Sequence, residues 1–449
     1  MECHAIRHRF ITYYQQNDFR LLPPAPLLHP SVPMSFVMSA GLGQIETSLA
    51  NVKNRDGNKF VLVQDCFRHF DRESVGNDAT HLSLFEMPAA FMFGNNKKEI
   101  TINHLWQLAT KNLGIEVEHL WVSYFAGGKL EGQQLPQDKT TYQTWREIGV
   151  ADNRLVGLGI KDNYWVQGKG LQNTPTNPRK CGPSTELFYD RGVETSCGSA
   201  CQPGCPCGRF IEFANLLFIA YTLNPQTNVI ELMAEPFVET VIGTERTAMI
   251  LQGVDSVFAI HNYRAVLDGI EIFITNKDLP LQLIRKSKRI IVDHLRALCV
   301  LVKDGAPPPG KNGRERLIKL LIRSIITQQM LLGITAKKFL SAIIQLVAEF
   351  LAQENKLTLA IINKISLYFE RERLKFKKTI SQGQHQLELR LQQNQGTSFP
   401  GTQIVFFEKE LGLPYSLILY ILQQKGLSFS KHDYENALLN WKHSLKLGV

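Results

Sequence analysis

The first half of the chain alternates short apolar runs with turns rich in glycine, proline and asparagine. Runs dominated by apolar and aromatic residues occupy positions 60–67, 82–93, 120–126 and 237–243. Bounded by turn residues, they predict β-strands. A pattern with helical spacing follows residue 100. Because strands and helices do not alternate regularly, we predict an α+β fold with an antiparallel sheet flanked by helices, and not a doubly wound parallel sheet.

After about residue 254 the pattern changes, because apolar positions then recur at helical spacing over long stretches. Amphipathic helices are predicted at residues 285–302, 314–326 and 337–353. The segment DGAPPPGKNG (304–313) reads as a loop between the first two helices. The Gln-rich segment 389–403 is predicted to be an exposed connection.

The two parts also differ in charge, and we place the domain boundary between residues 1–253 and residues 254–449. The second part holds 28 Lys and Arg against 16 Asp and Glu, a formal charge of +12, whereas the first part carries −3 of the total of +9. A basic domain beside a nearly neutral one suggests a module that binds a polyanion. A solvated basic surface would produce the same charge pattern.

The composition is that of a soluble globular protein, with 44% hydrophobic and 20% charged residues. No apolar run approaches the roughly 18 residues that suggest a membrane span. The N-terminal segment MECHAIRHRF lacks the apolar region of a secretory signal. We therefore expect no membrane partner and a cytoplasmic location.

Four of the eight cysteines crowd into eleven positions, as Cys197, Cys201, Cys205 and Cys207. In a cytosolic chain this crowding favours metal binding over two disulfides. Four thiolates suit a tetrahedral, structural Zn²⁺ site that would pin a loop without a core of its own. The alternative is a set of reduced loop thiols.

Arginines and carboxylates lie on strand-like stretches of the first half, in the segments CFRHFDRESVG (66–76), HLSLFEMPAAFMFG (81–94), CGPSTELFYDRG (181–192), FIEFANLLFIAY (210–221) and ETVIGTERTAMILQG (239–253). In this order they resemble the catalytic core of the alanyl-tRNA synthetase family, which belongs to class II. The segment around Arg68 resembles motif 2, a strand, loop and strand with an arginine before the turn. The segment 241–246 resembles motif 3, a strand entering a helix.

Further segments extend the resemblance over nearly the whole chain. FVMSAGL (36–42) resembles motif 1, and DNYWVQG (162–168) with the Cys181-Gly182-Pro183 segment resembles the Trp-containing strand and Cys-Gly-Pro turn of the family. In the second half the matching segments are 290–298, 370–383 and 411–425. The resemblance implies a truncated paralogue with a catalytic domain and a helical tRNA-recognition domain, without the editing and C-terminal domains.

The resemblance also implies roles for individual residues around ATP. Arg68 would hold the α-phosphate through its planar guanidinium, and Arg72 would contact the outer phosphates. Arg246 would cover the adenine and the terminal phosphate, with Phe85 as the opposing stacking face and Gly243 beside the nucleotide. Adenylation needs positioning and charge neutralisation more than a general base, so we expect Arg68 and Arg246 to be the catalytic residues. Glu212 and Glu86 both remain candidates to hold Mg²⁺.

The amino-acid pocket is implied in the same way. Glu239 stands where the family has the aspartate that binds the α-amino group, and Met87, Trp165, Leu217 and Val241 would line the pocket. Leu217 replaces a smaller valine and Val241 replaces a glycine. The added volume predicts a small amino acid, with alanine or glycine first.

For the tRNA acceptor stem we expect contacts in the basic second half, at Lys311, Asn312, Arg314, Arg316, Lys319, Arg323 and Lys409. Helical spacing puts Arg316, Lys319 and Arg323 on one face. Gly310 and Lys409 stand where the family reads a G·U wobble pair, so weak dependence on that pair is expected. Two other functions stay open: an adenylating ligase that loads a carrier protein or small acceptor, and a non-catalytic RNA-binding paralogue.

Overall fold

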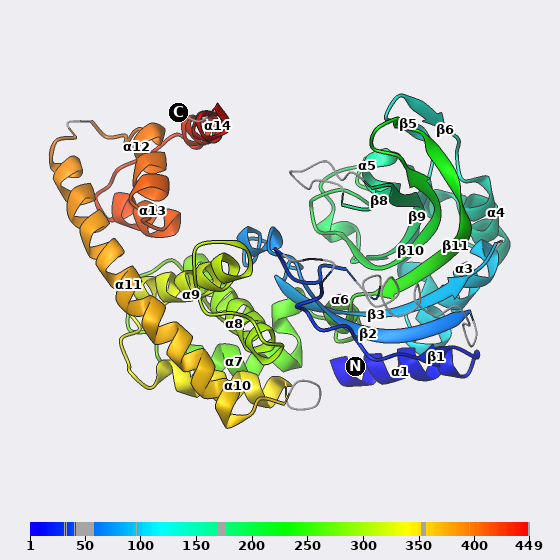
Figure 1. Ribbon diagram of the computed structural model, residues 1–449, viewed down its shortest axis with the longest axis horizontal. Coiled ribbons are helices and arrows are strands. Elements are labelled where there is room, and N and C mark those ends of the chain that lie inside the picture. The colour runs from blue at the N-terminus through cyan, green and yellow to red at the C-terminus, as the bar shows by residue number, and fades with distance from the viewer. Residues whose placement is uncertain are drawn as a thin grey trace. The chain divides into compact units, whose positions relative to one another are not determined.

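The computed structural model divides the chain into two compact units, shown in Figure 1. The first unit consists of residues 1–68 and 78–264, and the second of residues 69–77 and 265–449. The structure describes residues 1–30, 32, 34–39, 41, 58–95, 97–168, 177–351, 356–394 and 396–447.

The first unit is built on a nine-stranded sheet with the order β1-β2-β3-β11-β10-β9-β4-β7, and β8 pairs with β9. Its strands are β1 (Arg20–Leu21), β2 (Lys59–Phe67), β3 (Leu84–Phe93), β4 (Leu120–Phe125), β7 (Leu155–Leu158), β8 (Tyr164–Val166), β9 (Arg179–Asp190), β10 (Phe210–Leu223) and β11 (Ile230–Ile242). A small hairpin of β5 (Gly128–Leu130) and β6 (Gln133–Leu135) stands apart. Among the described strands of this sheet, only the edge pairs β1 with β2 and β4 with β7 are parallel, so the predicted α+β fold with a mainly antiparallel sheet is confirmed.

Helices cover one face of this sheet. They are α1 (Cys3–Gln15), α3 (Lys98–Gln107), α4 (Lys139–Ile148) and α6 (Thr244–Leu251), and the short α5 (Ile160–Asn163) precedes β8. Helix α1 packs on β2 and β3, α6 on β3 and β10, and α3 on β10 and β11. The buried indole of Trp145 on α4 donates a hydrogen bond of 2.9 Å to Thr185 on β9. These helices leave the side chains of the opposite face to form the site described below.

The predicted Cys-Gly-Pro turn is wrong, because Cys181, Gly182 and Pro183 lie inside strand β9. Opposite them β10 carries an irregular register between Leu217 and Tyr221. A Cβ on Gly182 would come within 1.9 Å of the Phe218 carbonyl oxygen. The glycine therefore allows the bulged strand to approach, at a position where the resemblance implied a turn.

Replacing Gly182 with alanine is expected to destabilise the first unit by about 3 kcal/mol, because the backbone of β10 must move to admit the methyl group. Urea unfolding would measure the loss. Gly159 is the matched control, since a Cβ there meets nothing within 4 Å. Equal stability of the Gly182→Ala and Gly159→Ala proteins would contradict the close approach.

The second unit is helical. Its helices are α8 (Leu281–Lys303), α9 (Gly313–Leu331), α10 (Phe339–Leu351), α11 (Leu359–Gln392), α12 (Gly401–Val405), α13 (Tyr415–Gln424) and α14 (Lys431–Leu447), and α7 (His261–Glu271) runs across the boundary between the units. The three helices predicted from apolar spacing are confirmed. The predicted connection at 389–403 begins too early and ends too late, since α11 continues to Gln392 and α12 begins at Gly401. Leu, Gln and Arg are good helix formers, and buried Leu387 ties this end of α11 to its neighbours.

The boundary between the units also differs from the predicted one at residues 253 and 254. Residues 254–264 stay with the sheet, because the Val257 amide donates to the Ala79 carbonyl oxygen and Asp255 pairs with Arg191. Residues 69–77 belong to the helical unit, where a Cβ on Gly76 would lie 3.1 Å from the Lys286 carbonyl oxygen. No helix within the described residues combines the length and apolarity that crossing a membrane requires.

Candidate functional site

Two rows of paired residues cross the face of the sheet that the helices leave uncovered. The first row joins Ala89, Val241, Asn215, Glu186 and Ser123 on β3, β11, β10, β9 and β4. Directly paired residues on neighbouring antiparallel strands point to the same face. The register therefore brings together side chains that are far apart in the sequence.

The second row holds two of the five residues predicted for the amino-acid pocket, Glu239 and Leu217. Phe91 pairs with Glu239, Glu239 with Leu217, and Leu217 with Ser184. The carboxyl group of Glu239 is buried, with the residue only 2% exposed. One acidic group thus lies under a mostly apolar surface.

The other predicted pocket residues gather at the same place. Met87, Trp165 and Leu217 are partly buried and pack against one hydrophobic cluster that includes Val241. Trp165 reaches it from β8, where it pairs with Gly182. The structure therefore brings all five predicted pocket residues onto one face.

Arg68 lies at the end of β2, immediately before the loop to β3. Its Nε atom donates to the Met38 carbonyl oxygen at 3.0 Å, and its guanidinium carbon lies 4.8 Å from the centre of the Phe85 ring. Met38 belongs to the predicted motif 1 segment, of which residues 40 and 42 lie outside the described residues. Phe85 is thus covered by Arg68 and not by Arg246 in this structure.

Arg246 extends from the first turn of α6, which Gly243 caps after strand β11. Its Nη1 atom donates to the Glu212 carbonyl oxygen at 2.9 Å and lies 3.4 Å from the Glu212 carboxylate. About 29% of the Arg246 side chain and 40% of the Glu212 side chain are exposed, so this ion pair stays open to solvent and to a ligand.

A second carboxylate, Glu186, lies close to Glu212. Asn215 donates to one Glu186 oxygen at 3.1 Å and Ser123 donates to the other at 3.3 Å. Burial, together with the charge of Glu212, raises the pKa of Glu186 well above its usual value. Two crowded carboxylates of this kind suit a cation.

Sequence reasoning missed Glu186 and Asn215. Glu186 stands two residues after Ser184 and therefore points to the same face of β9. The spacing of two residues in the sequence indicates that Ser184 and Glu186 share a face of β9. Only the pairing of β9 with β10 shows that this face also carries the predicted pocket residue Leu217. The alternative magnesium ligand, Glu86, pairs with Arg7 at 2.5 Å and accepts a hydrogen bond from Thr244 at 2.7 Å. Glu86 neighbours Phe85 and Met87 along β3, so it points to the helix-covered face.

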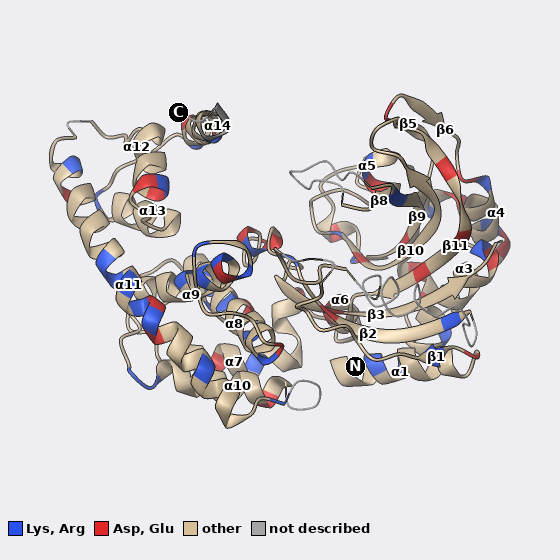
Figure 2. Cartoon of the chain, in the orientation of Figure 1, with Lys and Arg blue, Asp and Glu red and all other residues tan. Residues whose placement is uncertain are grey.

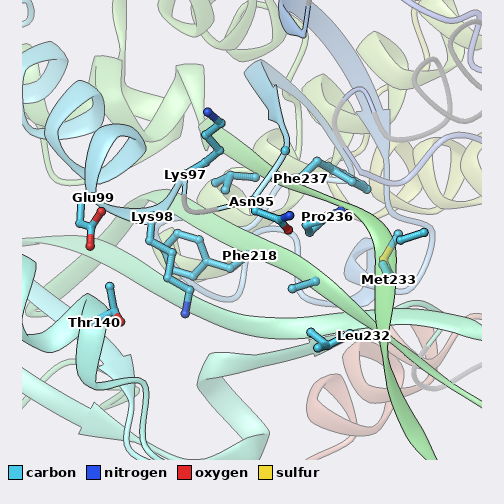
Figure 3. A pocket seen from close by; sticks show the side chains of 14 residues that line it. Asn95, Lys97, Lys98, Glu99, Thr140, Phe218, Leu232, Met233, Pro236 and Phe237 are labelled. Atoms are coloured by element: carbon cyan, nitrogen blue, oxygen red, sulfur yellow. The ribbon is translucent and has the colours of Figure 1, made fainter.

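A pocket of about 630 Å³ lies on the helix-covered side of the sheet, at the N-terminal end of α3. Figure 3 shows Lys98 reaching over Phe218 toward this pocket. The Lys98 ammonium also pairs with Asp138 at 2.5 Å. None of the predicted site residues lines this pocket, so it is separate from the site on the other face.

The four clustered cysteines bring their sulfur atoms together at the tip of the connection between β9 and β10. All four sulfur atoms lie within 4.8 Å of one another. The Cys197 and Cys205 sulfurs are 3.2 Å apart, and those of Cys201 and Cys207 are 3.4 Å apart. Four Zn–S bonds of about 2.3 Å in a tetrahedron separate the sulfurs by roughly 3.8 Å. The donor set therefore fits a zinc ion.

Hydrogen bonding within the cluster shifts the pKa values of two of the thiols in opposite directions. The backbone amide of Cys197 lowers the pKa of Cys201 to about 6. Hydrogen bonding to Cys205 raises the pKa of Cys197 to about 12. The lowered pKa favours the thiolate form of Cys201, which is the form that binds metals.

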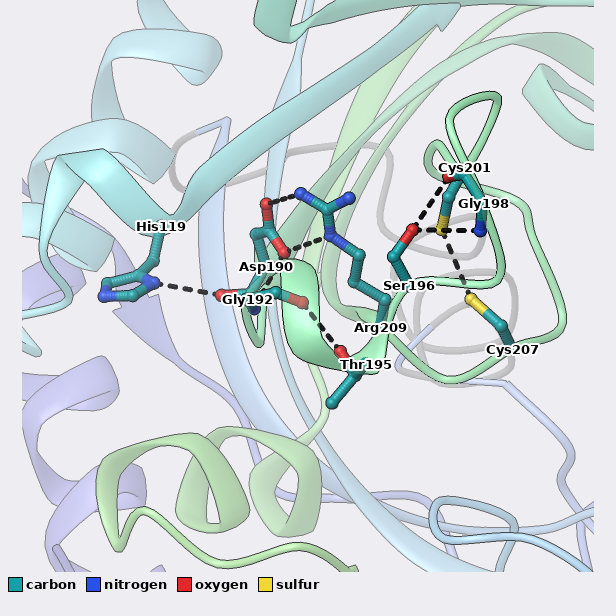
Figure 4. Close-up of polar contacts among 9 residues, drawn as sticks. All are labelled: His119, Asp190, Gly192, Thr195, Ser196, Gly198, Cys201, Cys207 and Arg209. Atoms are coloured by element: carbon teal, nitrogen blue, oxygen red, sulfur yellow. Dashed lines mark hydrogen bonds and ion pairs between the residues drawn. The ribbon is translucent and has the colours of Figure 1, made fainter.

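An ion pair closes the base of this cysteine loop. Arg209 donates two hydrogen bonds to Asp190, at 2.7 and 2.6 Å, and the backbone amide of Gly192 donates to the same carboxylate. Figure 4 shows this base beside Cys201 and Cys207. Short polar contacts thus anchor the loop at its base, and the thiols meet at its tip.

In the second unit several predicted RNA-binding cations lie close together. Burial lowers the pKa of Lys319, and the charges of Arg323, Arg316 and Lys311 act in the same direction, opposed by Glu372. We call Lys311, Arg316, Lys319 and Arg323 the α9 cluster. Arg72 also belongs to this unit, and burial followed by the nearby charge of Arg316 lowers its pKa.

Two of the predicted RNA contacts are engaged within the unit. Arg323 forms an ion pair of 2.6 Å with Glu372, which is buried, and its guanidinium lies 4.6 Å from the Phe376 ring. Lys409 pairs with Glu408 at 2.7 Å and lies 6.0 Å from the Trp441 ring. Lys311, Asn312 and Arg316 are exposed, and Arg314 is half-buried.

Known proteins resemble this chain along almost its entire length. The family described as "tRNA synthetases class II (A)" matches residues 5–447. An alanine–tRNA ligase of Alkaliphilus oremlandii is 28% identical over 438 residues, covering 96% of this chain and 47% of that protein. An alanine–tRNA ligase of Desulforudis audaxviator is 31% identical over 448 residues, covering 98% of this chain and 48% of that protein.

This chain therefore spans about half the length of the curated relatives it matches. Among solved structures, apo histidyl-tRNA synthetase of S. aureus aligns with 58% of this chain and 68% of that chain. The two chains are 9% identical over this alignment, and its TM-score is 0.32. Because the family matches residues 5–447, nearly the whole chain, the chain belongs to the class II (A) tRNA synthetases.

Proposed function

We propose that this chain activates a small amino acid, alanine or glycine first, as its aminoacyl-adenylate and transfers it to a tRNA. One observation carries the proposal: the sheet register places a buried acid, Glu239, on the face that also holds Glu186, with Arg246 paired to Glu212 beside it. Charges suited to an amino group and to phosphates thus belong to the same face of the sheet.

In the first step a carboxylate oxygen of the amino acid attacks the α-phosphorus of ATP, and pyrophosphate leaves with the bonding electrons. Arg68, with its guanidinium held over Phe85, stabilises the charge that develops on the α-phosphate. Arg246 gives up its contact with the Glu212 carboxylate and binds the nucleotide. In the second step a terminal hydroxyl of the tRNA attacks the acyl carbon, and AMP leaves.

Glu186 and Glu212 are the residues that would hold Mg²⁺, which would neutralise phosphate charge when ATP is bound. Their crowding and the raised pKa of Glu186 support this assignment. Glu86 is a weaker candidate because Arg7 and Thr244 occupy its carboxylate.

The amino-acid pocket favours a small substrate. Leu217 pairs directly with Glu239, and Met87, Trp165 and Leu217 pack against the hydrophobic cluster that includes Val241. A larger substrate side chain would compete with Leu217 and Val241 for space near the buried carboxylate of Glu239.

Replacing Glu239 with glutamine is expected to raise the KM for the amino acid about a hundredfold, since the ammonium group loses a charge-assisted partner. The KM for ATP should stay within about twofold. Steady-state ATP–pyrophosphate exchange measures both constants. An increase confined to ATP would contradict the assigned role of Glu239.

The second unit is proposed to bind the acceptor stem of the tRNA through the α9 cluster together with Arg314 and Asn312. Like charges crowded at this place support the assignment, because a phosphate backbone relieves their repulsion. Arg72 lies near Arg316, so its proposed contact with the outer phosphates of ATP stays a prediction. Lys409 is engaged with Glu408, which agrees with weak reading of the G·U pair.

The cysteine loop is proposed to hold one structural zinc ion through Cys197, Cys201, Cys205 and Cys207. The mutual approach of four sulfur atoms supports this proposal. The zinc would stiffen the connection between β9, which carries Glu186, and β10, which carries Glu212.

ATP–pyrophosphate exchange with each amino acid in turn tests the function. Exchange driven by alanine or glycine is expected. Exchange only with a large aromatic amino acid would refute the pocket assignment. No exchange, together with retained tRNA binding, would favour the non-catalytic RNA-binding alternative.

A further inference from the structure

Helix α11 presents a row of four cations along one face. Lys364, Arg371, Lys375 and Lys378 follow one another at intervals of seven, four and three residues. At 100° per residue these positions fall within an arc of about 60°, and the row is about 21 Å long. Lys364 is half-buried, and the other three residues are exposed. Figure 2 shows basic bands along α11.

The acidic residues of this part of α11 are engaged by cations outside the row. Glu370 pairs with Arg373 at 2.6 Å, and Glu372 is buried against Arg323. In the part of the chain that the structure describes, Arg371, Lys375 and Lys378 form no ion pair within the protein. The row thus keeps its positive charge.

Such a row costs stability when nothing neutralises it. Cations at spacings of three and four residues repel each other along a helix. Arg371 and Lys375 have this spacing, and so do Lys375 and Lys378. A partner that repeats negative charge along its length would relieve the repulsion at every position.

The row shares its helix with a contact of the α9 cluster. Arg323 of that cluster donates to Glu372 at 2.6 Å, and Glu372 lies between Arg371 and Arg373 on α11. The two sets of cations therefore belong to adjacent helices of one unit.

We infer that the α11 row, Lys364, Arg371, Lys375 and Lys378, binds the phosphate backbone of RNA as a second contact beyond the α9 cluster. The inference rests on the proposed tRNA binding and adds a surface to it. A straight row of about 21 Å suits a backbone with evenly repeated phosphates. It carries no base-reading geometry, so it fixes the position of the RNA and not its sequence.

Two single substitutions on the same helix test the row with equal changes in charge. Lys375→Glu reverses a cation in the row, and Lys377→Glu reverses an exposed cation about 200° away around the helix. Binding of unfractionated tRNA is measured by filter retention between 50 and 200 mM salt. Lys375→Glu is expected to weaken binding and to reduce the slope of log K against log salt by about one to two. Lys377→Glu should change the slope by less than about half a unit.

Three outcomes would overturn the inference. Equal losses in both variants would show a general effect of net charge. No loss in either variant, with binding weakened by Arg316→Glu in the α9 cluster, would leave the proposed function standing without the α11 row. If sedimentation showed altered self-association only for Lys375→Glu, and this variant still bound RNA normally, the row would be assigned to a protein partner. Circular dichroism checks that both variants keep their helical content. If the unaltered protein bound no tRNA, the proposed function itself would fail.

Discussion

Replacing Arg246 with alanine is expected to lower the rate of ATP–pyrophosphate exchange by about a thousandfold, because the variant would lack the positive charge that we propose Arg246 brings to the nucleotide. Arg68→Ala should produce a loss of similar size, since the α-phosphate loses a planar donor pair at the position where charge develops. Lysine at either position should restore only part of the activity. A lysine side chain restores the positive charge but lacks the planar set of hydrogen-bond donors that a guanidinium group provides.

Arg146→Ala is the matched control. Arg146 forms an exposed ion pair with Asp152, and both side chains are more than half exposed. Removing such a pair changes stability by less than about 1 kcal/mol, and exchange should stay near the unaltered rate. Full exchange activity in Arg68→Ala or Arg246→Ala would refute the site assignment.

Loss of zinc is expected when Cys201 and Cys205 are both replaced by serine. Metal analysis should find about one zinc ion per unaltered chain and almost none in the double variant. The effect on the loop should be large, because structural zinc sites in small domains contribute roughly 10 kcal/mol at neutral pH. Limited proteolysis between residues 192 and 208 should become fast in the variant.

Ser199→Ala is the control for the zinc experiment, since Ser199 lies in the same loop and provides no thiol. Chelation of the unaltered protein should make four additional thiols titratable. The remaining cysteines, Cys3, Cys66, Cys181 and Cys299, are buried and stay unreactive while the fold persists. A metal-free protein with the four loop thiols already titratable, or already joined as disulfides, would contradict the zinc site.

Much of the fold follows from periodicity alone. The strands around residues 60–67 and 237–243 and the long helices of the second half stand where apolar spacing predicts them. The turn that the resemblance implied at residues 181–183 is wrong, because Gly182 admits the Phe218 carbonyl oxygen from a neighbouring strand. Nothing local to residues 181–183 distinguishes that role from a turn.

The residues of the candidate site also fall into those that the sequence could predict and those that it could not. The resemblance to one family supplied Arg68, Glu239 and Arg246, whose residue types stand in recognisable motifs. Glu186 was missed because its closeness to Glu212 exists only in the register of β9 and β10. The pairing of Arg323 with Glu372 joins residues 49 positions apart, so the helical spacing that groups Arg323 with Arg316 and Lys319 could not show it.

The pairing of β3 with β11 sets the order in which the site becomes complete. Ala89 pairs with Val241, and Phe91 pairs with Glu239. Strand β3, which carries Phe85, therefore cannot complete its pairing until β11, which is synthesised much later, is available. Closing so long a loop is entropically slow and follows the formation of local hairpins. Nucleotide affinity should therefore arise late in refolding, in step with β11 docking. A fluorescent ATP analogue added during refolding would report this final closure of the sheet.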